Sequence, residues 1–169
     1  MTTYVALLRA VNVGGTGKLP MSGLRAMCEA AGFEHVRTYI ASGNVVFESA
    51  SSARQVKDAL QAAMQEFAGS LVDVHVRTGP EMQAVLGANP FPDAAPNRTV
   101  AIFLDQAPPA DTLDGISGRR DEQIALGKRE IYVHYGAEMG QSKLKIRAAK
   151  TGTARNMNTV AKLVEMSNS

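Results

Sequence analysis

The sequence predicts an α+β fold made of two ferredoxin-like halves, residues 1–78 and 79–169, with the second half an incomplete or variant copy. The first observation is that short apolar runs alternate with segments of helical periodicity in the order βαββαβ over residues 1–78. The second is that the remaining residues repeat much of this order as βαββα, without visible sequence repetition. The last predicted element is a basic C-terminal helix.

The first strand and the first helix follow from the spacing of apolar residues. The run "TYVALLRA" (3–10) is short, apolar and followed by Gly14-Gly15, which is typical of a buried strand. A helix is predicted from about Pro20 to Ala31, and Gly32 supplies its C-terminal stop. Its apolar stripe holds Leu24, Met27, Cys28 and Ala31. We therefore predict that Cys28 is a small, buried core residue without a catalytic role.

A hairpin and a second helix–strand pair complete the first half. The strands "HVRTYI" and "VVFES" flank Gly43-Asn44, and glycine accepts the positive φ that tight turns require. Ser52 and Gln55 have the spacing of a capping box, which opens a helix to about Phe67. The alternation of apolar and polar residues in "LVDVHVR" then predicts a half-buried strand.

The second half begins with another capping box, Thr78 to Glu81, which opens a short helix. After a Pro-rich connection, "TVAIFLD" predicts a strand and "PPADTLDGI" a short helix. The segments "EQIAL" and "EIYVHY" predict a hairpin around Gly127-Lys128. The final helix is predicted in "ARNMNTVAKLVEM", with Thr153 as its N-cap.

The composition is that of an ordinary soluble globular protein, with 45% hydrophobic and 20% charged residues. No apolar run approaches the roughly 20 residues that span a bilayer, and no signal peptide is visible. A single cysteine excludes an internal disulfide and a cysteine-rich metal site, and the three histidines lack metal-ligand spacing. We expect a cytoplasmic protein without membrane contact, metal site or cofactor, and its oligomeric state is left open.

Positive charge is concentrated near the C-terminus. Residues 143–169 hold six Lys and Arg residues against Glu165 alone, a local charge of +5, although the whole chain carries only +2. This asymmetry is compatible with an anionic ligand at the C-terminal end and equally with a solvated basic face.

The stretch "LLRAVNVGGTGKLPM" (7–21) resembles a nucleotide-binding loop but fails both tests for one. A Walker A loop that used Gly17-Lys18 would need glycine at position 12 and Ser or Thr at position 19, where the chain has Asn12 and Leu19. The dinucleotide pattern fails at Pro20. The glycines between the first strand and helix either let successive amides face an anion or only permit a tight turn.

The predicted topology brings this loop to the first hairpin. In a ferredoxin-like sheet the first and second strands run parallel, so the loops that follow them emerge at the same edge. We therefore predict a cluster of six residues there, either for an anion or to fix the shape of the loops. The six are Asn12, Gly14, Gly15, Ser42, Gly43 and Asn44.

A second candidate anion site lies at the start of the final helix. Free amides at a helix start combine there with the positive charges of Lys150 and Arg155. The apolar stripe of the helix predicts that Arg155 and Asn158 lie on or near its polar face. The alternative is a capped and solvated helix. The full candidate set is Ser142, Lys143, Lys150, Arg155, Asn156 and Asn158.

Four ordered stretches carry a resemblance to a known family. These are "YVALLRAVNVGG", "AGFEHVRTYIASGNVVFES", "SKL" and "TARNMNTVAKL". Together they resemble the bacterial family known as the domain of unknown function 1697, essentially from end to end. The resemblance implies two ferredoxin-like halves and a cytoplasmic protein, and it implies no activity, substrate or cofactor. The family usually has Trp where this chain has Met157, which weakens any interpretation in which a ring stacks on a ligand there.

Three classes of function follow. The favoured class is a binding module for a small anionic ligand that bears phosphate or carboxylate. Nucleic-acid binding ranks second, because ferredoxin-like sheets support it through exposed aromatic residues and here aromatics are only 5%. The third is an enzyme that acts on a phosphorylated metabolite, for which spacing alone assembles no nucleophile, base and acid. The acidic pair Asp121-Glu122 is adjacent, so on a strand the two carboxylates would point to opposite faces.

Overall fold

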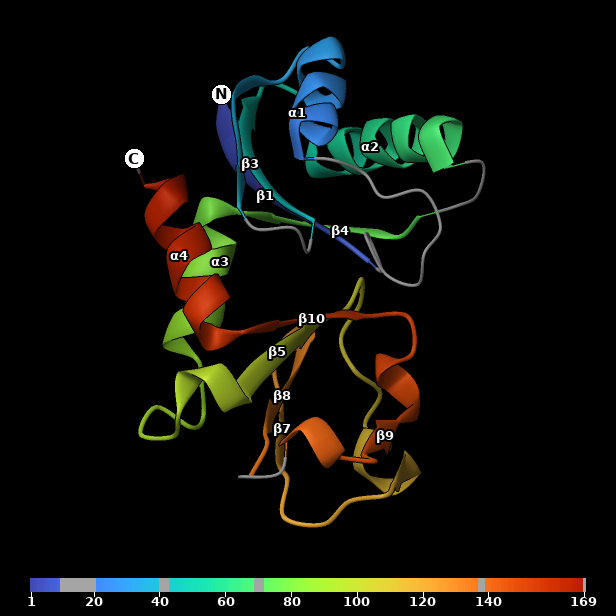
Figure 1. Ribbon diagram of the computed structural model, residues 1–169, viewed down its shortest axis with the longest axis vertical. Coiled ribbons are helices and arrows are strands. Elements are labelled where there is room, and N and C mark those ends of the chain that lie inside the picture. The colour runs from blue at the N-terminus through green and yellow to red at the C-terminus, as the bar shows by residue number, and fades with distance from the viewer. Residues whose placement is uncertain (10–20, 40–42, 69–71, 137–138, 169) are drawn as a thin grey trace. The chain divides into compact units, whose positions relative to one another are not determined.

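The computed structural model describes residues 1–9, 21–39, 43–68, 72–136 and 139–168 (Figure 1). It is a mixed α+β structure with antiparallel sheets. The chain forms two compact units, one of residues 1–82 together with 163–169, and one of residues 83–162. Within the described part of the chain, no helix is both long and apolar enough to cross a membrane.

The first unit has the predicted element order βαββαβ over residues 1–78. Its sheet has the strand order β2-β3-β1-β4, and every neighbouring pair is antiparallel. Strands β1 and β2 therefore run in the same direction on either side of β3. The elements are β1 (Thr2–Leu8), α1 (Met21–Ala30), β2 (Glu34–Tyr39), β3 (Asn44–Ser49), α2 (Ala53–Ala68) and β4 (Val74–Thr78).

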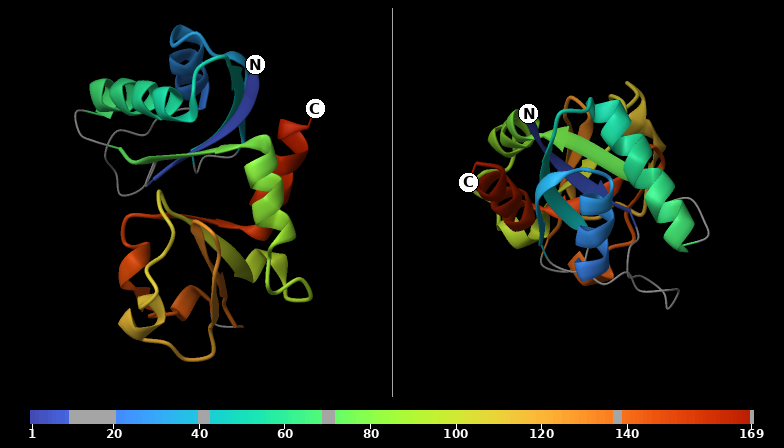
Figure 2. Two further views of the ribbon diagram at one scale, coloured as in Figure 1. Left: turned by 180° about the vertical axis from the view of Figure 1, so that it is seen from behind. Right: turned by 90° about the horizontal axis from the view of Figure 1, so that it is seen from above.

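The core of the first unit lies between this sheet and helices α1 and α2, which both cover the same face of it (Figures 1 and 2). Alternate residues of β1 point into this core, because successive side chains of a strand face opposite ways. The rings of Phe33 and Phe47 stack within it, with centroids 4.3 Å apart. Other members are Tyr4, Ala6, Leu8, Leu24, Cys28, Val56, Leu60 and Met64.

Local signals in the sequence set the ends of these helices as predicted. At the end of α1, Gly32 has φ of +90° and the Phe33 amide donates to the Cys28 carbonyl, which satisfies a carbonyl of the last turn. In the capping box of α2, the Ser52 amide donates to Gln55 Oε1 at 2.9 Å and the Gln55 amide donates to Ser52 Oγ at 3.2 Å.

A second reciprocal capping box opens α3 (Gly79–Gly87). The Thr78 amide donates to a Glu81 carboxylate oxygen at 2.8 Å, and the Glu81 amide donates to Thr78 Oγ1 at 3.2 Å. Both predicted capping boxes are thus confirmed.

The sheet of the second unit has the order β10-β5-β8-β7, again antiparallel throughout. Counted within each four-stranded sheet, both sheets place the first strand between the fourth and the third, with the second strand at an edge. The predicted hairpin is present, with Leu126 paired to Ile131. The strands are β5 (Thr99–Phe103), β7 (Gln123–Leu126), β8 (Glu130–His134) and β10 (Thr153–Asn156).

The connections in the second unit differ from those in the first. Where the first unit has α1 and α2, the second has short 3-10 turns and a two-stranded ribbon, in which β6 (Ile116–Ser117) pairs with β9 (Lys145–Ile146). The short helix predicted in "PPADTLDGI" is the 3-10 turn η2. The turns are η1 (Pro96–Arg98), η2 (Thr112–Gly115), η3 (Met139–Gln141) and η4 (Arg147–Ala149).

The last helix, α4 (Met157–Ser167), begins later than predicted, and the prediction of Thr153 as its N-cap was wrong. Residues 153–156 instead pair with β5 as strand β10, with Thr153 opposite Phe103. The hydrogen bonds of this pairing override the helical periodicity that runs through the segment. The cap is Asn156, whose Oδ1 accepts the Thr159 amide at 2.9 Å.

The other end of α4 belongs to the first unit. There Nη1 of Arg37, on β2, donates to the Met166 carbonyl at 2.6 Å. A cation at a helix C-terminus both satisfies a carbonyl of the last turn and interacts favourably with the helix dipole. This contact ties the last turn of α4 to the edge strand of the first sheet.

Cys28 is fully buried, as predicted, and burial raises the pKa of its thiol to about 12, with a smaller contribution from Glu29. Because the thiolate is the reactive form, we expect a disulfide reagent to leave Cys28 unmodified in the folded protein at mildly alkaline pH. Absorbance of the released thiol product measures the reaction. In concentrated guanidinium chloride the same residue should react at the rate of a free thiol. Fast modification without denaturant would contradict this prediction.

Candidate functional site

The first predicted site, at the sheet edge, is described only in part. Asn12, Gly14, Gly15 and Ser42 lie outside the described residues. Of the remaining two, Gly43 has φ of +82° and its carbonyl accepts the Leu8 amide at 2.9 Å, so the end of β1 adjoins the hairpin. Asn44 is fully buried and its Nδ2 donates to the Tyr39 carbonyl at 3.0 Å. This hydrogen bond spans the hairpin, which supports the interpretation that Asn44 fixes the shape of the turn.

The second predicted site, at the start of α4, is organised differently from the expectation. Arg155 lies in β10 rather than on the polar face of the helix, and only 7% of it is exposed. Its Nη1 donates to Thr153 Oγ1 at 2.6 Å and to the Ala154 carbonyl at 2.9 Å. Burial lowers the pKa of this guanidinium to about 10. The Asn156 side chain accepts a hydrogen bond from an amide in the first turn of α4, and Asn158 is exposed.

The other candidates of this set lie at two separate hollows of the second unit. Lys150 lines one of them and Ser142 lines the other. Lys143 is exposed and lines neither, and neither lining includes Arg155. The structure therefore divides a set that the sequence treated as one site.

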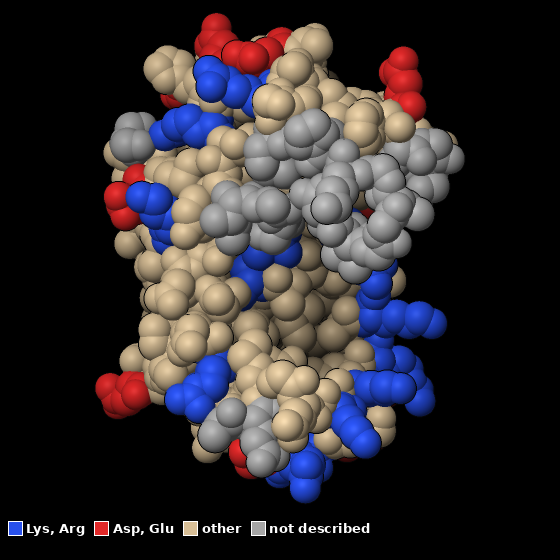
Figure 3. All heavy atoms as spheres, viewed as in Figure 1, with Lys and Arg blue, Asp and Glu red and all other residues tan. Residues whose placement is uncertain are grey.

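We call the first of these the basic hollow. It has a volume of about 570 Å³ and lies between η2–β6 and β9–η4. Three cations, Lys145, Arg147 and Lys150, line it against one carboxylate, that of Asp114. The apolar part of the lining is Ile116, Ile146 and Ala149, and Ile116 pairs with Ile146 across the ribbon. Figure 3 shows Lys and Arg side chains gathered over the side of the second unit where β9 lies.

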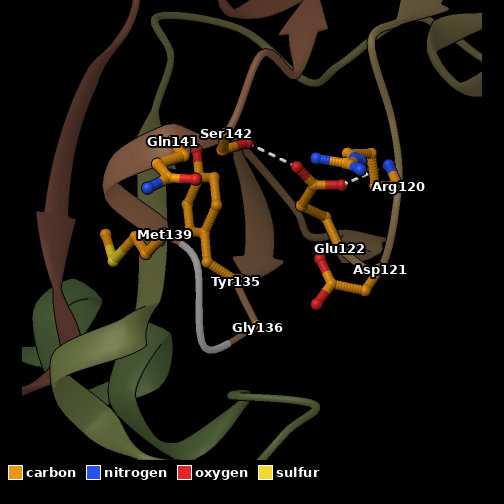
Figure 4. Close-up of a pocket in the computed structure, with 8 residues that line it drawn as sticks. All are labelled: Arg120, Asp121, Glu122, Tyr135, Gly136, Met139, Gln141 and Ser142. Carbon is orange, nitrogen blue, oxygen red and sulfur yellow. Dashed lines mark hydrogen bonds between the residues drawn. The ribbon is translucent and has the colours of Figure 1, made fainter.

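We call the second the polar cavity, which has a volume of about 510 Å³ (Figure 4). Its lining comes from the segment before β7 and from the segment between β8 and β9. Both Asp121 and Glu122 line it, and because these residues precede β7, the alternation expected for them on a strand does not apply. The lining consists of Arg120, Asp121, Glu122, Tyr135, Gly136, Met139, Gln141 and Ser142.

Glu122 holds the walls of the polar cavity together. The residue is only 3% exposed, and one carboxylate oxygen accepts the Ser142 hydroxyl while the other accepts the Arg120 amide at 2.6 Å. Arg119 Nε donates to the Glu122 carbonyl at 2.9 Å. The pKa of the Glu122 carboxyl is lowered chiefly by the Ser142 hydrogen bond, then by the Arg120 amide, and these outweigh the opposing effect of burial. Glu122 is therefore an ionised, hydrogen-bonded carboxylate.

The opposite wall is less polar. The phenol of Tyr135 is half-buried, and its pKa is raised by burial and by the charge of Glu122, so it stays neutral. A Cβ at Gly136 would lie 1.8 Å from Asp121 Oδ2, so a side chain there would displace the Asp121 carboxylate. The Asp121 carboxylate thus packs directly on the backbone at Gly136.

Sequence reasoning found only Ser142 of this cavity. Its two sides are brought together by contacts between residues about 20 positions apart, such as Ser142 with Glu122. The only hints of the cavity in the sequence are the adjacent carboxylates of Asp121 and Glu122 and the glycine at 136. None of these residues indicates which distant segment it will contact. Among the described residues, no three His, Cys, Asp or Glu side chains are grouped as a metal ion would require.

Asn156 and Asn158 allow a matched test of the cap. Asn156→Ala removes the side chain that accepts the Thr159 amide, which should lower the free energy of unfolding by about 1 kcal/mol. Asn158→Ala, at an exposed position two residues later, should change it by less than about 0.5 kcal/mol. Urea denaturation followed by circular dichroism measures both. Equal effects of the two substitutions would show that Asn156 is not the cap.

Glu122→Gln tests the cavity wall through pH. A carboxyl with a lowered folded-state pKa stabilises the fold above its ordinary value of 4.5, and this contribution is lost as pH falls below 4.5 through the folded-state pKa. We expect the variant to melt below the wild type at neutral pH, and to lose less stability on acidification below 4.5. Glu66→Gln, at an exposed position in α2, is the control. A wild type and a Glu122→Gln variant with parallel acid profiles would refute this role.

A search of curated proteins found no match to this chain. Among solved structures, the conserved bacterial protein SP0830 from Streptococcus pneumoniae is similar, with 26% sequence identity and a TM-score of 0.82. The match covers 98% of each chain. The family model described as "Protein of unknown function (DUF1697)" matches residues 1–132. This match confirms the resemblance seen in the sequence, and the chain belongs to the DUF1697 family.

Proposed function

We propose that this protein binds a small anionic ligand, bearing phosphate or carboxylate, and that the basic hollow is its binding site. The observation that carries the proposal is the convergence of Lys145, Arg147 and Lys150 on one hollow that holds a single opposing carboxylate. All three residues are exposed.

Several cations are needed for useful affinity. An exposed ion pair contributes at most about 1 kcal/mol, so one lysine would not hold a metabolite. Three cations around one hollow add their contributions, and Arg147 can offer a two-pronged hydrogen bond to a phosphate or carboxylate. The apolar lining from Ile116 and Ile146 suits a ligand in which the anionic group is joined to a carbon skeleton.

The alternatives have less support. Of the nine Phe and Tyr residues, all of which are described, only Phe67 is exposed, and it lies in α2 rather than on a strand. Sheets that bind RNA stack bases on exposed strand aromatics, so nucleic-acid binding remains the second choice. An enzyme acting on a phosphorylated metabolite would need an acid or base, and Asp114 is the one carboxylate lining the basic hollow.

The remaining parts of this proposal concern fold and location. We propose that both units are variants of the ferredoxin-like fold, which is supported by their common strand order. The second unit would be a variant in which the two helical connections are replaced by turns and the β6–β9 ribbon. A cytoplasmic location is also proposed.

Of the two sites predicted from sequence, the start of α4 is the weaker candidate for an anion, because Asn156 already caps it.

Arg147→Ala combined with Lys150→Ala tests the site, with pyrophosphate and citrate as probes. We expect at least one probe to raise the melting temperature of the wild type. In the double variant its affinity should fall roughly tenfold, because two exposed charge pairs of up to about 1 kcal/mol each are lost. Isothermal titration calorimetry measures the affinity.

Lys143→Ala is the matched control, since it removes a nearby exposed cation that does not line the basic hollow. It should leave affinity within about twofold of the wild type, a difference of roughly 0.4 kcal/mol. An equal loss of affinity in Lys143→Ala and in the double variant would indicate that only the overall positive charge matters, not the basic hollow. No response of the wild type to either probe would reject the proposal. Strong, salt-sensitive retention on heparin would favour nucleic-acid binding instead.

A further inference from the structure

We propose that the polar cavity is a second binding site, which takes a small molecule that bears a primary ammonium group. This inference is independent of the basic hollow, since the two linings share no residue. It rests on the charge of the cavity, on the groups that are available in it and on their arrangement around a half-buried ring.

The charge of the lining favours a cation. Asp121 and Glu122 contribute two carboxylates against the single guanidinium of Arg120. In Figure 4 the Glu122 side chain lies between Tyr135 and Arg120. The Glu122 carboxylate is therefore nearer to the Tyr135 ring than the Arg120 guanidinium is. Glu122 is committed to Ser142 and to the Arg120 amide, and it therefore supplies negative potential rather than a direct contact.

Three other side chains supply the contacts. Asp121, Gln141 and Tyr135 all line the cavity, and their side chains form no hydrogen bond or ion pair with the rest of the described chain. A carboxylate, an amide oxygen and a phenol oxygen are all acceptors. A primary ammonium has three N–H donors and can donate to such acceptors, whereas a quaternary ammonium has none.

The ring side of the cavity suits the remainder of such a ligand. The neutral Tyr135 ring offers a face that attracts a cation, and the Met139 thioether is a polarisable neighbour for a methylene chain. The Asp121 carboxylate lies beside the backbone at Gly136, where an added Cβ would displace it.

Putrescine is the probe, with butanediol as its neutral isostere and choline as a quaternary ammonium. We expect chemical-shift changes of cavity residues on titration of the wild type with putrescine, and weaker or no changes with the other two compounds. Asp121→Asn keeps the shape and removes the charge, and it should weaken putrescine binding about tenfold, as expected for one charged hydrogen bond. Asp93→Asn, an exposed acid outside both hollows, should bind like the wild type.

Two further variants and the control compounds complete the test of the ammonium site. Gly136→Ala should also weaken putrescine binding, because the new Cβ displaces the Asp121 carboxylate. If Asp121→Asn does not fold, Gln141→Ala at an exposed position replaces it in the comparison. Equal binding of butanediol or choline, or unchanged affinity in Asp121→Asn, would overturn the inference. Pyrophosphate binding should be the same in Asp121→Asn and the wild type, so failure here is distinguishable from failure of the anion site.

Discussion

The pairing of β10 with β5 determines much of the second unit. It adds the fourth strand to that sheet and gives it the strand order seen in the first unit. It also draws residues 153–156 out of the helix that follows, so that Asn156 stands at the junction and becomes the cap of α4. Because strand residues alternate between faces, the same pairing buries Arg155 and leaves Ala154 exposed. The backbone hydrogen bonds between β10 and β5 thus determine where the side chains of Ala154, Arg155 and Asn156 lie.

Both hollows lie where the second unit departs from the first. In the first unit, α1 and α2 lay apolar stripes over one sheet face, and a continuous core fills the space. In the second unit, the connections between the same strands are 3-10 turns and a ribbon of two residues on each side. These short elements pack apolar residues such as Ile116 and Ile146 against the strands. The basic hollow and the polar cavity are lined from these connections, and binding residues are often carried by loops on a rigid scaffold.

The features that the sequence predicted well are those whose cause is local. Both capping boxes, the stop at Gly32 and the buried position of Cys28 follow from residues within one turn of a helix, and the structure confirms each of them. The predicted start of α4 was wrong because residues 153–156 fit a helical period. They form a strand only because they pair with β5. The polar cavity could not be predicted, because its lining forms only where residues 120–122 meet residues 135–142, as in the hydrogen bond of Ser142 to Glu122. The sheet-edge cluster stays a prediction, since only Gly43 and Asn44 are described.

The division of α4 between the two units bears on the order in which the chain can fold. The first unit consists of residues 1–82 and also of residues 163–169, and its β2 binds the Met166 carbonyl through Arg37, 129 positions earlier in the sequence. On a ribosome, strands β1 to β4 emerge while the partner of Arg37 has not yet been synthesised. The N-terminal unit therefore reaches its final set of contacts only after the whole of the other unit has been made. Contacts of such long sequence separation slow folding, and here the contact has to wait until residues 83–162 have been synthesised.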